Sequence, residues 1–288
     1  MPRKWAQRYN VRKGDELDLE EQGNKVIITS GKGIEIQKAE LDIDNLDPMV
    51  LRCITALYKK GVDEIKIVFS KPEAIASVQK AIGKEAVGFE ITEQGKGFCI
   101  IKHVSGELED FDSVLRRTFL LLNSMANECF DSLKKGDLEN LKNVAFLEEA
   151  NNRFTTTCRR HLNKKGVAEG QVGPIYCIIE ALENIADEYK YLCNALYEMR
   201  TKKIKISPEI LEFFKETNSM LQSAYEAYYS FDKTKISAIG RKRKQMVERM
   251  RELLHKSSAT EDKLLIHHSS IIMQKIFCMT GPYLILRL

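Results

Sequence analysis

The chain has 288 residues, and its 45 lysines and arginines nearly balance its 41 aspartates and glutamates, for a formal net charge of +4. This balance excludes a molecule that binds polyanions over its whole surface, so any nucleic-acid contact has to come from a local patch. The seven cysteines are scattered without a CxxC pair, which argues against a disulfide framework.

The first residues are charged and carry no hydrophobic run, and no stretch reaches about 18 uninterrupted apolar residues. From these two absences we expect neither a signal peptide nor a transmembrane segment. The sequence therefore predicts a cytoplasmic, soluble protein.

Residues 1–31 carry the pattern of a small hairpin. Residues 5–9 can form one helical turn, and Leu17 and Leu19 then alternate with acids. A turn at 22–24 leads into the apolar stretch 26–28, which we expect to pair with the acidic strand. Such a piece is too small to fold alone.

Residues 32–105 predict a small α/β domain. The expected elements, in order, are a strand from 34–36, a helix over 48–60, a strand through Ile65, Ile67 and Phe69, a helix to about residue 82 that opens with capping-box spacing at 70–73, and a hairpin of 89–91 with 98–101. Neither Gly31-Lys32-Gly33 nor Gly95-Lys96-Gly97 has the spacing of a phosphate loop, so both are predicted to be turns.

From residue 106 onward, apolar residues recur at three- and four-residue steps, which predicts an all-helical region over 106–288. The expected helices are 110–135, 137–163, 174–199, 208–228, 236–256 and 259–288. They divide into two units of similar length, 106–203 and 204–288, as a duplicated three-helix bundle would. The whole chain is therefore predicted to be α+β.

Two acids stand out on the helix 174–199. Glu183 and Asp187 are four residues apart and lie on one face, at the shoulder of the apolar stripe. Two stacked carboxylates repel each other unless a cation or a basic partner lies between them. The alternative is a pair of solvated surface acids beside Lys190.

Three short stretches of the first 31 residues, 2–5, 11–17 and 26–28, resemble the second half of an AbrB/SpoVT-type swapped-hairpin motif. In that family a preceding basic strand completes the barrel and reaches DNA. That strand is missing here, which means either that the domain is degenerate or that the chain begins late. We therefore expect a truncated AbrB-like fragment whose DNA contact is weak and comes from Arg3 and Lys4.

The helix pair 146–154 and 182–189 resembles the PhoU family of phosphate uptake regulators, and the layout of the full chain is similar to its archaeal-type members. The resemblance implies a non-enzymatic regulator of phosphate uptake and intracellular phosphate homeostasis. It would act by binding a phosphate transporter or a sensor component, and it would be a homodimer.

The PhoU family carries Glu/Asp-x-x-x-Asp motifs that hold metal ions on bundle helices. Glu183 and Asp187 match this motif, and Glu148 and Asn152 match it with asparagine in the second place. The resemblance thus implies a divalent metal or iron bound by carboxylates at these four residues. The second helical unit carries little acid at the corresponding places, so no metal is expected there.

A basic run, Arg241-Lys242-Arg243-Lys244, is the candidate partner-binding site, and an anionic membrane surface, nucleic acid or an acidic partner would each fit it. The alternative is a solvated helix face. His267 and His268 are adjacent on a helix and point about 100° apart, so a packing role is expected rather than metal ligation.

Two further functions compete with the phosphate regulator. The first is a transcription regulator whose AbrB-like end binds DNA while the bundle senses a ligand. The second is an enzyme with a carboxylate-bridged metal centre, which would need four or more converging ligands. The sequence offers three acids and one asparagine for that centre.

Overall fold

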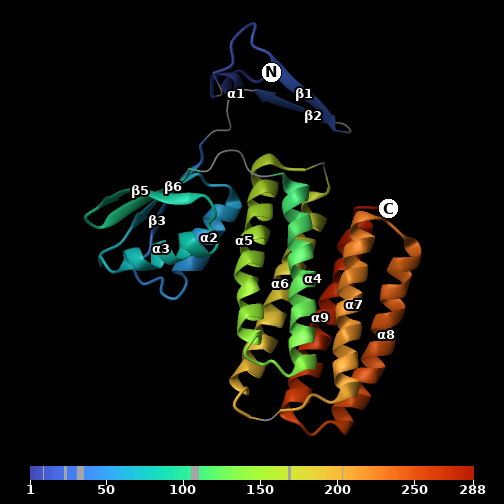
Figure 1. Cartoon of the computed structure of the whole chain (residues 1–288). Helices are drawn as coiled ribbons and strands as arrows, with labels where there is room; N and C mark the ends of the chain where they lie inside the picture. The colour runs from blue at the N-terminus through green and yellow to red at the C-terminus, as the bar shows by residue number, and fades with distance from the viewer. Residues whose placement is uncertain (9, 23–24, 31–35, 105–109, 168–169, 203) are drawn as a thin grey trace.

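The structure is a computed structural model of the whole chain, and it describes residues 1–8, 10–22, 25–30, 36–104, 110–167, 170–202 and 204–288. Three parts follow one another along the chain: a small hairpin, a domain built on a four-stranded sheet, and a bundle of long helices (Figure 1). This arrangement confirms the predicted α+β class.

The hairpin region confirms the predicted turn of helix and strand pair. The short helix α1 (Arg3–Arg8) precedes β1 (Leu17–Gln22), which pairs antiparallel with β2 (Lys25–Ser30). Leu19 and Val26 are exposed although they are apolar. In Figure 1 the hairpin stands beyond the end of the helical bundle.

The α/β domain contains six elements, namely β3 (Lys38–Asp42), α2 (Val50–Lys60), β4 (Glu64–Val68), α3 (Ala74–Lys84), β5 (Phe89–Gly95) and β6 (Phe98–His103). The strand order is β3-β4-β6-β5, with β3 parallel to β4 across the α2 crossover and the other pairs antiparallel. Alternate strand residues such as Ile65 and Ile101 are fully buried under α2 and α3.

Three predictions in this domain need correction or lie outside the described residues. The capping box at 70–73 is wrong: the side chain of the N-cap residue Glu73 caps nothing, and the hydroxyl and N–H of Ser70 instead bond to the carboxylate of Asp44. The strand expected from 34–36 falls mostly outside the described residues, and the strand that the structure contains begins at Lys38. Gly31-Lys32-Gly33 also lies outside the described residues.

The described bundle consists of α4 (Phe111–Lys135), α5 (Leu141–Lys165), α6 (Val172–Glu198), α7 (Pro208–Tyr229), α8 (Lys233–Lys256) and α9 (Thr260–Ile285). These bounds agree with the periodicity except at two helix starts. Helix α5 begins at Leu141, because the carboxylate of Asp137 accepts the N–H of Asn140 in the preceding turn. Helix α8 begins at Lys233, because Asp232 caps it.

One continuous hydrophobic core contains buried residues from all six of these helices. The apolar stripe of α6 lies at its centre, where Leu182, Ile185 and Leu196 are completely buried. Helix α6 packs against both α5 and α9 and so joins the two predicted three-helix units. None of the described helices combines the length and the apolar character needed to cross a bilayer.

Helix α5 contacts both the other bundle helices and the α/β domain. One side packs against α4 and α6 in the bundle, and α2 of the α/β domain packs against another side. Figure 1 shows the sheet domain seated beside this helix. No residue between 147 and 162 is exposed. The polar residues of this stretch therefore have to find partners inside the protein.

Candidate functional site

An open groove of about 430 Å³ lies where the α/β domain meets α5 and α6. Its walls come from α2, the end of α3, the first half of α5 and the C-terminal half of α6. The charged and amide residues that line it are Lys84, Glu85, Lys142, Glu148, Glu149, Asn152, Lys190 and Asn194. Two of the four predicted metal ligands, Glu148 and Asn152, thus face the same groove.

Lys190 is the centre of the polar cluster in this groove. Its ammonium donates to Glu148 Oε1 at 2.7 Å and to Asp187 Oδ1 at 2.5 Å. Asn152 Nδ2 donates to the same Glu148 oxygen at 2.7 Å. A side chain of α6 therefore bridges a carboxylate of its own helix and one of α5, whereas no contact among the described residues places a cation between Glu183 and Asp187 themselves.

Burial and hydrogen bonding shift the pKa values of Glu148 and Lys190. Desolvation raises the pKa of Glu148 above its usual value, against the opposing effect of Lys190. Burial acts to lower the pKa of Lys190, but its hydrogen bonds to Asp187 and Glu148 outweigh burial and raise that pKa. The bridge therefore keeps its positive charge at neutral pH.

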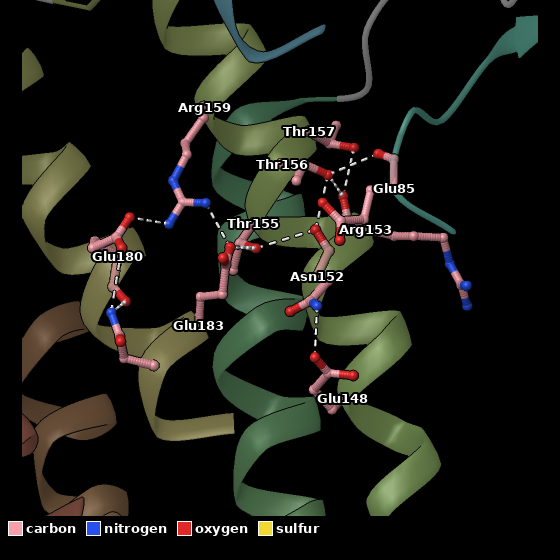
Figure 2. A network of polar contacts seen from close by, with 11 residues as sticks. Glu85, Glu148, Asn152, Arg153, Thr155, Thr156, Thr157, Arg159, Glu180 and Glu183 are labelled. Carbon is pink, nitrogen blue, oxygen red and sulfur yellow. Dashed lines mark hydrogen bonds and ion pairs between the residues drawn. The ribbon is translucent and has the colours of Figure 1, made fainter. Parts of the chain in front are cut away.

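Glu183 lies one helical turn from Asp187, and Figure 2 shows that Thr155 connects it to the backbone carbonyl of Asn152, whose side chain contacts Glu148. Glu183 Oε2 accepts from Thr155 Oγ1 at 2.6 Å and from Arg159 at 2.5 Å. Arg159 also donates to Glu180 at 2.6 Å, and its guanidinium lies over the ring of Tyr176. Arg159 is only 1% exposed, so this network holds a buried cation between α5 and α6.

The next residue, Arg160, fastens the α/β domain to the bundle. It donates to the carbonyl oxygens of Tyr58 and Val62 and, at 2.7 Å, to Asp63 Oδ1. Lys164 contacts the same Asp63 carboxylate. A charged guanidinium with three acceptors is a strong and directional link, so the two walls of the groove are held in one relative position.

The predicted metal ligands do not fit a metal site in this arrangement. One feature favours a ligand: Asn152 Oδ1 is buried without a partner among the described residues. However, the Lys190 ammonium lies between Glu148 and Asp187, and Glu183 is engaged by Arg159. Among the described residues, no group of three or more His, Cys, Asp or Glu is placed to hold a metal ion.

The predicted basic site on α8 does not form one face. Arg243 turns inward and donates to Gln274 of α9, with Phe277 under its guanidinium, and Lys242 pairs with Glu216 of α7 at 3.1 Å. Arg241 and Lys244 are exposed. Four consecutive helical residues point around the whole axis, which is why half of the run faces neighbouring helices.

The remaining candidates are placed simply. Arg3 and Lys4 are exposed on α1, beside the hairpin. His268 packs between α9 and α6, with Nδ1 2.9 Å from Glu188 Oε2, while His267 is exposed. The packing role predicted for this pair therefore fits the position of His268.

Sequence reasoning missed Arg159, Arg160 and Thr155. The available signal was their position, because Thr155 and Arg159 fall at helical spacing with Cys158 and Leu162 on the buried side of the helix. A cation at such a place needs a buried partner. Lys190 was noted only as a neighbour of the two acids.

In the described residues, the fold is that of an α+β chain in which a sheet domain packs against a bundle of six helices and is linked to it by Arg160 and Lys164. No family model matches this sequence, and no curated protein matches it either.

Proposed function

We propose that this chain is a phosphate-responsive regulator that acts by binding a transporter or sensor component, as a PhoU-like protein would. It would work in the cytoplasm as a homodimer. The proposal assigns recognition to the groove between the α/β domain and the bundle, and it assigns no chemical step to the chain.

The observation that carries the proposal is the bridge from Lys190 to Glu148 and Asp187. A protein cation already balances these carboxylates. The groove therefore presents charged groups that are already paired, together with amides, rather than a vacant metal site or a nucleophile. Such a surface recognises polar groups by hydrogen bonding and by electrostatic fit.

Two further features support binding by a partner rather than by a small molecule alone. The groove is open, and Phe146 stands at its edge with 67% of its surface exposed. Aromatic side chains in such positions are common anchors of protein interfaces. Because Arg160 holds both walls in place, little ordering is needed when a partner docks.

The test is recovery of partners from cells grown at high and at low phosphate, with tagged protein as bait. The parent is compared with Phe146→Ala combined with Lys142→Glu, and with the matched surface control Leu120→Ala combined with Lys215→Glu. We expect a transporter or sensor component whose recovery changes with phosphate and falls only in the groove variant. Recovery that ignores phosphate and the groove variant would contradict the proposal.

A second candidate function is DNA binding by the first 31 residues. The observation that favours it is the hairpin itself, which stands beyond the bundle with the exposed cations Arg3 and Lys4 close by on α1. We expect weak binding without sequence preference that falls steeply with salt, because phosphate contacts alone would carry it. Nanomolar, sequence-selective binding at physiological salt would instead favour the transcription regulator.

A further inference from the structure

In Figure 1 the α4–α5 turn and the connection from α6 to α7 lie at the end of the bundle farthest from the hairpin. A second groove, of about 590 Å³, is lined by residues of these two connections. Its lining includes the partly buried apolar side chains of Leu138, Ile204 and Leu211. This groove contains none of the residues of the site between the domains.

Basic side chains surround these apolar residues. Lys134 and Lys135 come from the last turn of α4, and Lys202 and Lys205 come from the connection after α6. Within the described residues none of these four ammonium groups forms an ion pair. Elsewhere on the bundle, lysines such as Lys190 and Lys235 contact a carboxylate.

The acids of the same groove leave this charge largely uncompensated. Glu139 is paired with Arg200 at 3.3 Å, which leaves Asp137 as the one remaining acid among the described lining residues against four lysines. The partial negative charge at the end of α4 favours lysines in its last turn, which accounts for Lys134 and Lys135. Lys202 and Lys205 are not in a helix, so this effect does not explain them.

We propose that this groove docks an acidic peptide segment of a partner protein, with apolar side chains inserted between the lysines. The apolar lining suits side chains of leucine type, and the surrounding lysines suit carboxylates on either side of them. A bilayer surface or a nucleic-acid backbone would engage the lysines but not the apolar hollow. Stacking of bases is also disfavoured, because the guanidinium of Arg200 covers the nearby ring of Tyr197 at 4.0 Å. The proposal does not depend on the phosphate-linked function.

The test uses fluorescence anisotropy with two labelled peptides, one of alternating glutamate and leucine and one of alternating glutamate and serine. We expect the full chain to bind the leucine peptide more tightly than the serine peptide, with affinity falling as salt increases. Equal affinity for both peptides, or no binding of the leucine peptide, would overturn the proposal.

The groove variant carries Lys134→Glu, Lys135→Glu, Lys202→Glu and Lys205→Glu. We expect it to bind the leucine peptide at least roughly tenfold more weakly. The matched control reverses four exposed cations elsewhere on the bundle, as Arg116→Glu, Lys215→Glu, Lys233→Glu and Arg251→Glu, and should keep the parent affinity. An equal loss in both variants would mean general electrostatic attraction and would overturn the assignment.

Circular dichroism is the check that both variants retain the helical fold. If the fourfold reversal unfolds, the milder pair Lys202→Gln with Lys205→Gln takes its place, and a loss of peptide affinity is again expected. Phosphatidylserine vesicles and a single-stranded oligonucleotide complete the experiment. If either of these binds through the four lysines more tightly than the leucine peptide, the groove is not a peptide site.

Discussion

Arg159 and Arg160 are neighbours in the chain, both are almost completely buried, and they bind different partners around α5. Arg159 faces α6 through Glu180 and Glu183, whereas Arg160 faces the α/β domain through Asp63 and two backbone carbonyls. About 100° separates adjacent helical side chains, so two consecutive arginines can link α5 to two different partners. The position of the sheet domain is thereby connected to the position of α6.

We predict that Arg160→Met separates the two cores. The change removes a charged donor from Asp63, which keeps Lys164, and from the carbonyl oxygens of Tyr58 and Val62, and the loss of such hydrogen bonds costs about 1–3 kcal/mol. Amide hydrogen exchange should show the strands β4 and β6 opening before α6. Arg153→Met, on the same helix but without an ion pair among the described residues, should leave the order of exchange unchanged. If the sheet domain and the helical bundle still open together in the Arg160 variant, Arg160 is not the link between the two cores.

The free energy of unfolding should decrease on mild acidification because of His103. Burial and the positive charge of Arg160 lower the pKa of this imidazole below its usual 6.5, although Asp63 opposes the shift. The unfolded chain therefore binds a proton before the folded chain does. The stability present above about pH 6.5 is lost as the pH falls through the folded-state pKa.

Urea unfolding at a series of pH values between about 7 and 5 measures this effect. The parent should lose stability over the range, and His103→Gln should lose less. The exposed His267 provides the control, since His267→Gln should follow the parent. If the free energy of unfolding depends on pH in the same way in the parent and in His103→Gln, the His103 imidazole is not the cause of the loss.

The role of Lys190 as the cation of the groove predicts how metals act on stability. The melting temperature of the parent should not respond to a chelator, because the ammonium already neutralises Glu148 and Asp187. Lys190→Gln leaves these carboxylates facing each other, so Mg²⁺ or Mn²⁺ should stabilise this variant. An ion at a hundred times its dissociation constant would add about 2.7 kcal/mol.

The control for this experiment is Lys142→Gln, which removes a lysine of the same groove that is not between the carboxylates. It should behave like the parent. If chelation lowers the melting temperature of the parent itself, the metal site implied by the family resemblance regains support. In that case Glu183→Gln with Asp187→Asn should abolish the response.

The basic run of α8 should divide into two functional pairs. Reversing the exposed Arg241 and Lys244 to glutamate should change the free energy of unfolding by no more than about 0.5 kcal/mol. Reversing Lys242 and Arg243 breaks contacts with Glu216 and Gln274, and it should cost about 1–3 kcal/mol. Chemical denaturation of the two double variants measures the difference. Equal costs would mean that the inward contacts contribute nothing.

Much of the fold could be predicted because buried positions recur in the sequence as apolar residues with the period of a helix or a strand. The stripe through Leu182, Ile185 and Leu196 indicated α6, and alternation through Ile65 and Ile67 indicated β4. A strand was expected to start at 34–36, but its course through β3 was not predicted, because the sequence Lys38-Ala-Glu-Leu-Asp42 has little apolar character and its alternate positions are exposed. Periodicity reports burial, and this short edge strand is buried only in part.

The candidate site was predictable only in outline. The spacing of Glu183 and Asp187 indicated a need for positive charge, but spacing within one helix cannot identify a partner on another. The structure supplies Arg159 to one acid and Lys190 to the other. Which cation reaches which carboxylate depends on the relative rotation of α5 and α6, and that follows from packing.

The enclosure of α5 also has a consequence for sequence variation. A typical amphipathic helix keeps a solvent-facing stripe that accepts nearly any polar residue. Between 147 and 162 α5 has no exposed position, so no such stripe exists there. Saturation mutagenesis of the chain should therefore show this segment as an unbroken intolerant block. The exposed positions of α8, such as Arg241, Lys244 and Arg251, should in contrast show permissive sites at helical intervals.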